Sequence, residues 1–115
     1  MKKGKYILIT PNVGVEVKCD GDGEKPTLEF LQKCVGGWIE HVASDNVPSG
    51  VDIYCNEEGK LNYLPYNDAA TILYGNPHDF IVGTAVVVGH NDEGESLWLT
   101  DEQVCAVVNA VRNAS

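Results

Sequence analysis

Three histidines are the side chains best suited to metal binding or acid–base chemistry. They are His41, His78 and His90, and either chemistry would need carboxylates or thiols within reach of the imidazoles. His90 opens the segment His90-Asn91-Asp92-Glu93, which gathers an imidazole and carboxylates in one expected turn, although turns favour these polar residues anyway. His41 follows Glu40 on an expected strand, where neighbouring side chains point to opposite faces. His78 has no evident partner nearby in sequence. We expect no metal site and no cofactor.

The four cysteines lack the spacing of metal ligands. They are Cys19, Cys34, Cys55 and Cys105, with no CxxC pair and no zinc-ribbon spacing. Cys55 and Cys105 lie in apolar segments, where thiols are usually inert core residues. A catalytic pair of cysteine and histidine stays open, because such residues meet in space rather than in sequence. We expect reduced cysteines, as in a cytoplasmic protein.

Motifs that carry catalysis or bind ions are absent from the sequence. It contains no GxSxG, HExxH, GxGxxG or Walker-type motif. Asp20-Gly21-Asp22 resembles the start of a calcium loop, but Lys25 stands where glycine is needed and Leu31 where a bidentate glutamate is needed. We therefore expect a protein that is not an enzyme. An apolar cleft with a histidine beside a carboxylate or thiol would revise that expectation.

Negative charge is the most distinctive property of the chain. The net charge is −9, and residues 61–111 contain no lysine or arginine. Acidic residues near the end of that stretch are the candidates for a protein-binding surface: Asp92, Glu93, Glu95, Asp101 and Glu102. Such a surface repels nucleic acid and anionic membranes, whereas a basic groove on another protein would attract it. Two simpler readings stay open, because acidic excess maintains solubility and because Asp101 and Glu102 suit a helix N-terminus.

Aromatic residues indicate a second kind of site. Trp38, Tyr63 and Tyr66 could stack on a nucleotide base, and Lys60 could offset part of its phosphate charge. The segment Tyr63-Leu64-Pro65-Tyr66 stands out, because it places two aromatic rings around a proline in an expected loop. The same rings are also good core residues, so a small-molecule site is the alternative to a protein-binding surface.

The pattern of apolar residues predicts an α+β fold in a single domain of residues 1–115. Strands are expected at residues 5–10, 13–18, 38–43, 51–55, 61–63, 80–88 and 96–99. Helices are expected after the caps Thr27, Asn67 and Thr100, the last with a capping box to Gln103. This order predicts an antiparallel or mixed β-sheet of about five to seven strands, with three helices packed on one face of it. We expect no signal peptide and no membrane span, and a homo-oligomer stays open.

Four parts of the chain together resemble a known family. They are Val35–Glu40, Cys55–Lys60 with Leu64–Asn67, Ile81–Val88, and Leu99–Gln103. The sequence is similar to a domain of unknown function carried by bacteriophages, plasmids and conjugative elements. No activity or catalytic residue is established for that family. The resemblance therefore implies a setting, an accessory protein of a mobile element in the cytoplasm of a bacterial host cell, rather than a site.

The charge and the resemblance together lead to a functional expectation. We expect a non-enzymatic binding protein that inhibits a bacterial host-defence protein through its acidic surface. The partner would be a basic protein, such as a host-defence nuclease or another nucleic-acid-binding protein. The alternative is a small-molecule binder, such as a sponge that sequesters a nucleotide immune signal.

Overall fold

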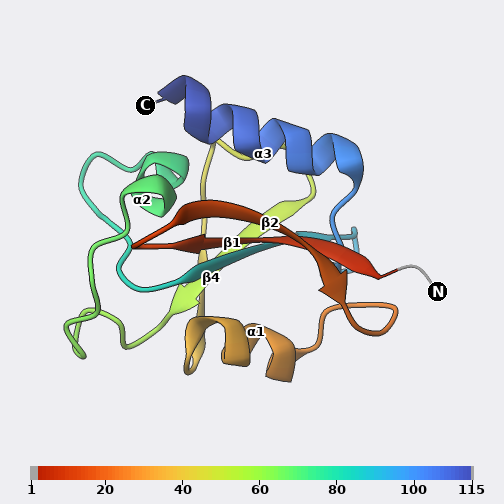
Figure 1. Ribbon diagram of the computed structural model, residues 1–115, viewed down its shortest axis with the longest axis horizontal. Coiled ribbons are helices and arrows are strands. Elements are labelled where there is room, and N and C mark those ends of the chain that lie inside the picture. Colours follow the sequence, from red (N-terminus) through yellow and green to blue (C-terminus); the bar gives the residue numbers. More distant parts are fainter. Residues whose placement is uncertain (1–2, 115) are drawn as a thin grey trace.

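Six strands form one antiparallel sheet in the computed structural model, which describes residues 3–114 (Figure 1). The strands are β1 (Gly4–Thr10), β2 (Gly14–Gly21), β3 (Ile39–Val42), β4 (Val51–Asn56), β5 (Ala85–His90) and β6 (Ser96–Leu97). The helices are α1 (Leu28–Val35), α2 (Asp68–Tyr74) and α3 (Asp101–Ala114). The order across the sheet is β2-β1-β5-β4-β3, and β6 pairs with the end of β5. The predicted α+β fold with three helices is confirmed. No helix within residues 3–114 is long and apolar enough to cross a membrane.

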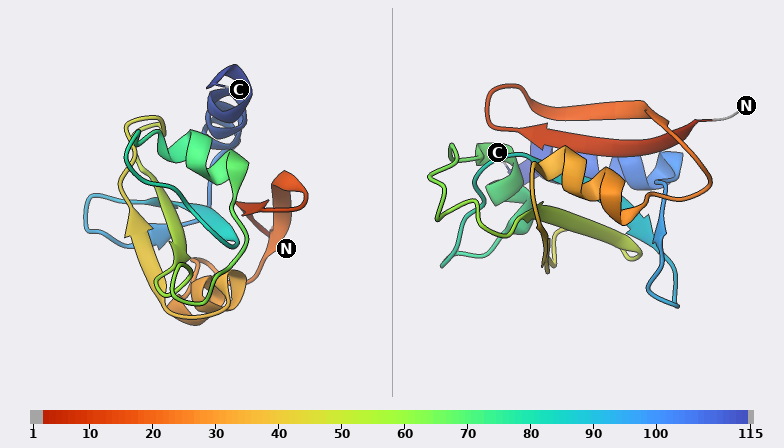
Figure 2. Two further views of the ribbon diagram at one scale, coloured as in Figure 1. Left: turned by 90° about the vertical axis from the view of Figure 1, so that its left-hand side faces the viewer. Right: turned by 90° about the horizontal axis from the view of Figure 1, so that it is seen from below.

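Helices cover both faces of the sheet, so the expectation that all three would pack on one face was wrong (Figure 2). β5 explains the difference, because its side chains alternate between the faces and all but its last residue are buried. Val87 joins the core under α2 and α3, whereas Val86 and Val88 join the core under α1. A strand that is apolar on both faces needs a covering layer on each.

Local signals set the ends of the helices as predicted. The side chains of Thr27 and Asn67 accept hydrogen bonds from backbone N–H groups of α1 and α2 at 3.1 and 3.0 Å. Thr100 and Gln103 form the capping box of α3, because each side chain accepts a hydrogen bond from the other residue's backbone N–H. Gly36 ends α1 with a left-handed φ of 79°, a conformation that favours glycine.

Two of the expected strands differ in the structure. Residues 61–63 do not pair back onto β4 and lie in a turn instead. The strand expected at residues 80–88 begins only at Ala85, because Gly83 has a positive φ of 72° and donates its N–H to the Pro65 carbonyl at 2.7 Å. The segment that precedes β5 is therefore held against the loop between β4 and α2.

Asn67 is the buried polar residue that joins these parts. Its side chain is fully buried, and its amide nitrogen donates hydrogen bonds to the carbonyl oxygens of Ile9 at 2.8 Å and Gly83 at 2.7 Å. Its amide oxygen accepts the Ala70 N–H at 3.0 Å, and its backbone N–H donates to the Ile81 carbonyl at 2.9 Å. One residue thus ties β1 and the segment before β5 to the first turn of α2.

Replacing Asn67 with alanine tests this role. Asn67→Ala leaves two buried carbonyl oxygens and one helix N–H without their partner, so we expect the free energy of unfolding to fall by about 3 kcal/mol. Thr27→Ala removes a cap from an exposed helix end, and we expect a loss of about 1 kcal/mol. Urea unfolding followed by circular dichroism measures both. Equal losses in the two variants would contradict the role assigned to Asn67.

Candidate binding surface

Two of the five acidic candidates are bound to lysines from the N-terminal half of the chain. Lys25 lies 2.7 Å from Glu95, and Lys5 pairs with Asp101. The hydrogen bond from Lys25, with a smaller contribution from Asn91, lowers the pKa of Glu95. The other three candidates are exposed: Asp92, Glu93 and Glu102. Folding therefore cancels part of the charge asymmetry that the sequence displays.

The turn that carries several of these carboxylates has a structural explanation of its own. The Asn91 side-chain oxygen accepts the N–H groups of Glu93 and Glu95, both at 3.0 Å. An asparagine that bonds to the backbone in this way stabilises a turn whatever the charge of its neighbours. Residues 91–95 thus need no binding partner to account for their conformation.

Three segments come together at one end of the fold, namely residues 36–38, 57–67 and 75–84 (Figure 1). They carry five of the eight large apolar side chains that are exposed in the described part of the chain. We call these five side chains the loop-end surface, and they are Trp38, Leu61, Tyr63, Tyr66 and Phe80. Their exposed fractions run from 44% at Phe80 to 92% at Tyr63. Single exposed apolar residues are common, but a group of them with four aromatic rings is typical of an interaction site.

Specific contacts hold the three loops to one another. The ring centroids of Tyr66 and Phe80 lie 5.7 Å apart, and the Lys60 ammonium lies 4.5 Å from the centroid of the Phe80 ring. The Glu57 N–H donates to the Trp38 carbonyl at 2.8 Å, which joins the chain after α1 to the loop after β4. The loop-end surface is therefore built on a hydrogen-bonded framework.

Tyr63 occupies a strained backbone conformation at the centre of its loop. Its φ of 54° is the one positive value outside glycine among residues 3–114. Bulky residues rarely adopt this left-handed conformation, and the strain costs about 1–3 kcal/mol where it occurs. Hydrogen bonds from Tyr63 to Lys60 and from Leu64 to Gly59 close the turn and hold it. Strained residues are concentrated at active and binding sites, so the strain at the exposed Tyr63 supports a binding site here.

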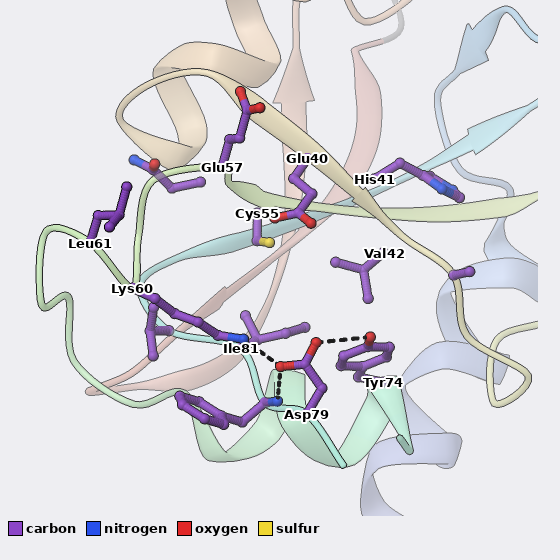
Figure 3. Close-up of a pocket in the computed structure, with 14 residues that line it drawn as sticks. Glu40, His41, Val42, Cys55, Glu57, Lys60, Leu61, Tyr74, Asp79 and Ile81 are labelled. Carbon is purple, nitrogen blue, oxygen red and sulfur yellow. Dashed lines mark hydrogen bonds and ion pairs between the residues drawn. The ribbon is translucent and has the colours of Figure 1, made fainter. Parts of the chain in front are cut away.

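A cavity of about 330 Å³ adjoins the loop-end surface, between β3 and the segment before β5 (Figure 3). Side chains of β3 and β4 form one wall, namely Glu40, Val42 and Cys55. The opposite wall consists of Lys60, Tyr74, Asp79, Phe80 and Ile81. Leu61 and Phe80 belong both to the cavity and to the loop-end surface, so the two are continuous.

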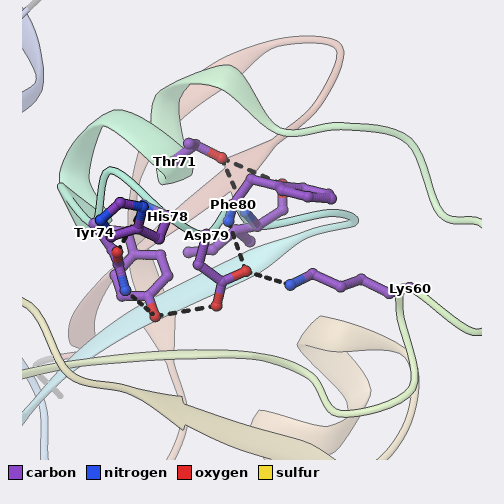
Figure 4. Close-up of polar contacts among 8 residues, drawn as sticks. Lys60, Thr71, Tyr74, His78, Asp79 and Phe80 are labelled. Atoms are coloured by element: carbon purple, nitrogen blue, oxygen red, sulfur yellow. Dashed lines mark hydrogen bonds and ion pairs between the residues drawn. The ribbon is translucent and has the colours of Figure 1, made fainter.

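Asp79 organises the polar side of the cavity (Figure 4). Its carboxylate accepts hydrogen bonds from the Lys60 ammonium, from the Tyr74 hydroxyl at 3.2 Å and from the Phe80 N–H at 2.8 Å. The hydrogen bond from Lys60 is the largest of the effects that hold the pKa of Asp79 below its ordinary value of 3.8. The same bond raises the pKa of Lys60. Both groups are therefore charged at neutral pH.

Cys55 and Glu40 face this network from the other wall. Burial, followed by the negative charge of Glu40, raises the pKa of the Cys55 thiol to about 11. The thiol is protonated at neutral pH and is not a nucleophile. The Glu40 carboxylate makes no hydrogen bond or ion pair with another side chain within residues 3–114. The cavity thus offers an apolar floor, one neutralised ion pair and one carboxylate without a direct partner.

A second polar cluster joins three strands on the face of the sheet that α1 covers. Asp52 Oδ1 lies 3.0 Å from both His41 Nε2 and His90 Nδ1, and the Tyr54 hydroxyl lies 3.5 Å from Asp52 Oδ2. The His90 contact has the distance of an ion pair but not the geometry of a hydrogen bond. No group of three potential ligands in the described part of the chain is arranged to hold a metal ion.

This cluster places histidines beside a carboxylate, which is one element of an acid–base site. The side chains of His41 and His90 are 51% and 37% exposed, and neither Asp52 nor His90 lines the cavity. Of this cluster, His41 lines the cavity, where the Glu40 carboxylate and the Cys55 thiol also lie. Sequence reasoning missed the cluster, because Asp52 meets the two histidines only through strand pairing.

The residues of the predicted small-molecule site separate into two groups. Lys60 lines the cavity. The Lys60 ammonium and the Tyr66 ring both lie beside the Phe80 ring. Trp38 and Tyr63 belong to the loop-end surface and do not line the cavity. Three further residues of the cavity were not predicted: Glu40, Asp79 and Phe80. Phe80 in particular opens an apolar run, which in sequence indicates a core residue.

Comparison with protein-family models identifies the family of the chain. Residues 4–112 match DUF3846, a domain of unknown function, and the chain belongs to this family. The expected resemblance to a domain of unknown function is confirmed at that level. No curated protein and no solved structure gives a significant match.

Asp79→Asn tests the ion pair at the cavity. Because folding lowers the pKa of Asp79, its carboxylate contributes stability above pH 3.8, and that contribution is lost as the pH falls through the lower, folded-state value. We expect the wild type to lose more stability than Asp79→Asn between pH 5 and pH 3, by about 0.5 kcal/mol, since the pair is partly exposed. Urea unfolding at each pH measures this. Asp92→Asn, the same change at an exposed aspartate, is the matched control. If the stability of Asp79→Asn depended on pH as strongly as that of the wild type, the assignment would be contradicted.

Proposed function

We propose that this protein is a non-enzymatic binding protein that docks on a basic partner protein through the loop-end surface. The main support for this proposal is the group of exposed aromatic and aliphatic side chains at one end of the fold. Aromatic residues at the centre of an interface supply much of its binding energy, because they bury a large area with little loss of conformational freedom. A strained turn and an adjoining cavity support the same location.

Charge around this surface favours a basic partner. Residues 36–84 span all three loops, and they contain seven aspartates and glutamates against one lysine, Lys60, and no arginine. Asp79 already neutralises Lys60. Glu57 and Glu58 are exposed in the same loop as Tyr63. A partner rich in lysine and arginine would therefore gain attraction at the rim and in the approach to it.

The acidic candidates of the C-terminal half take a lesser part in this proposal. Asp92, Glu93 and Glu102 add to the net charge of −9 and would speed association with a basic protein over a long range. Exposed charges of this kind contribute little to affinity once the complex has formed. The apolar anchors lie elsewhere, at the loop-end surface.

The acidic charge, together with the resemblance to a domain carried by mobile elements, supports a proposal for the biological role. We propose that the protein is an accessory protein of a bacteriophage or another mobile element, acting in the cytoplasm of a bacterial host. There it would inhibit a host-defence nuclease or another nucleic-acid-binding protein by covering a basic groove. A sponge for a nucleotide signal is less favoured, because the one ammonium at the cavity is bound to Asp79 and the Glu40 carboxylate repels phosphate.

Removing the rings tests the proposal without altering charge. Tyr63→Ala combined with Tyr66→Ala deletes two anchors of the loop-end surface. In bacteria that restrict a test phage by a nuclease-based defence system, we expect the wild-type protein to raise the plating efficiency at least tenfold, and the double variant to lose most of that gain. Circular dichroism and expression level establish that both proteins are folded.

A matched control removes charge and keeps the rings. Asp92→Asn combined with Glu93→Gln changes the turn 91–95, which lies at the opposite end of the molecule (Figure 1). We expect this variant to retain the gain in plating efficiency. Loss of the gain in this variant alone would instead identify the acidic turn as the binding surface. No gain with the wild type in any of a panel of nuclease-based systems would contradict an inhibitory role.

A further inference from the structure

The cavity beside β3 carries an excess of negative charge. Figure 3 shows the Glu40 side chain directed from β3 into the cavity, whereas the Glu57 carboxylate points away from it. Across the cavity lie Asp79 and Lys60, which neutralise each other. Glu40 is exposed and interacts with Lys60 without a direct ion pair, so the three groups together keep one net negative charge. The occupant that complements this charge is a cation.

The floor of the cavity requires that this cation carry an apolar stem. Val42, Cys55 and Ile81 are buried hydrophobic residues that line it. A small hydrated ion would gain nothing from such a floor, whereas the methylene groups of a long side chain would pack on it. The volume of about 330 Å³ is at the lower end of the range for ligand pockets and suits one extended side chain.

Lys60 demonstrates how this site accepts a cation. Its ammonium binds the Asp79 carboxylate and lies 4.5 Å from the centroid of the Phe80 ring. A carboxylate and an aromatic face are thus already arranged around one cation. A planar guanidinium suits the remaining carboxylate better than an ammonium does, because it can form two parallel hydrogen bonds to Glu40 while its face stacks on an aromatic ring.

We infer that the cavity binds an arginine side chain of the partner protein, with its guanidinium against Glu40 and its stem over Val42 and Ile81. The inference rests on the proposed function, since the loop-end surface would seat the segment of the partner that carries this arginine. Leu61 and Phe80 connect the two regions, so one exposed segment of the partner would contact both. The arginine gives the interaction its selectivity, and the aromatic surface supplies its area.

Nuclear magnetic resonance of the full chain labelled with ¹⁵N tests the inference with defined probes. The probes are capped tripeptides of glycine, a central residue and glycine, where the central residue is arginine, lysine or citrulline. Citrulline keeps the shape of arginine and lacks its charge. We expect arginine to shift the amide signals of Glu40, Cys55 and Ile81, lysine to bind at least threefold more weakly, and citrulline to cause no saturable shift. Equal binding of arginine and citrulline, or no shift at these residues, would overturn the inference.

Paired variants locate the charge that the probe recognises. We expect Glu40→Gln to weaken binding of the arginine peptide at least fivefold and Glu93→Gln, the same change in the turn 91–95, to leave it unaltered. Unchanged binding by Glu40→Gln would overturn the inference. Spermidine serves as a further probe, and tighter binding of spermidine than of the arginine peptide would reassign the cavity to a free polyamine.

Failure of this inference is distinguishable from failure of the proposed function. The variant with Tyr63→Ala and Tyr66→Ala keeps Glu40 and Asp79, so we expect it to bind the arginine peptide while losing the plating gain. A plating gain that survives Glu40→Gln would reject the arginine site and leave the loop-end surface in place. Arginine binding without any plating gain in the wild type would support the site and reject the inhibitory role.

Discussion

The buried amide of Asn67 is the constraint on which the geometry of the proposed binding surface depends. Its two donors and one acceptor are enclosed in the core, so each must be satisfied by protein, and all three are. These bonds fix where α2 begins and where the chain runs before β5. Tyr66 precedes this residue directly and bridges to Val82, which keeps the Tyr66 and Phe80 rings side by side. The hydrogen bonds of Asn67 therefore help to fix the positions of the Tyr66 and Phe80 rings.

Ion pairs formed on folding neutralise some of the acidic residues of the C-terminal half, which makes that half a weaker candidate for the binding surface. Along the sequence residues 61–111 contain no lysine or arginine, yet in the fold Lys5, Lys25 and Lys60 bind Asp101, Glu95 and Asp79. The carboxylates left without such partners include Glu40 beside the cavity and the exposed pair Glu57 and Glu58. An acidic rim around an apolar centre is the usual anatomy of an interface that recognises a basic protein.

Sequence reasoning succeeded where the controlling interactions are local. The caps at Thr27, Asn67 and Thr100 act within three residues, and the apolar run that contains β5 predicts a central strand from composition alone. It was wrong where long-range packing decides. The covering of both faces depends on which helix meets which side of β5, and the late start of β5 depends on the Gly83 bond to Pro65. The candidate site was found only in part, because Glu40 lies in β3 whereas Asp79 and Phe80 lie in the segment before β5, and only the fold brings them to one cavity.

We propose that recognition occurs at the loop-end surface and its cavity rather than at the acidic C-terminal residues. Amide hydrogen exchange, read by mass spectrometry for the protein alone and with an arginine-rich decapeptide, compares these regions in one experiment. With the peptide bound, we expect slower exchange in residues 57–66 and 79–83 and no change in residues 91–95. Protection confined to residues 91–95 and to the first turn of α3 would contradict this proposal.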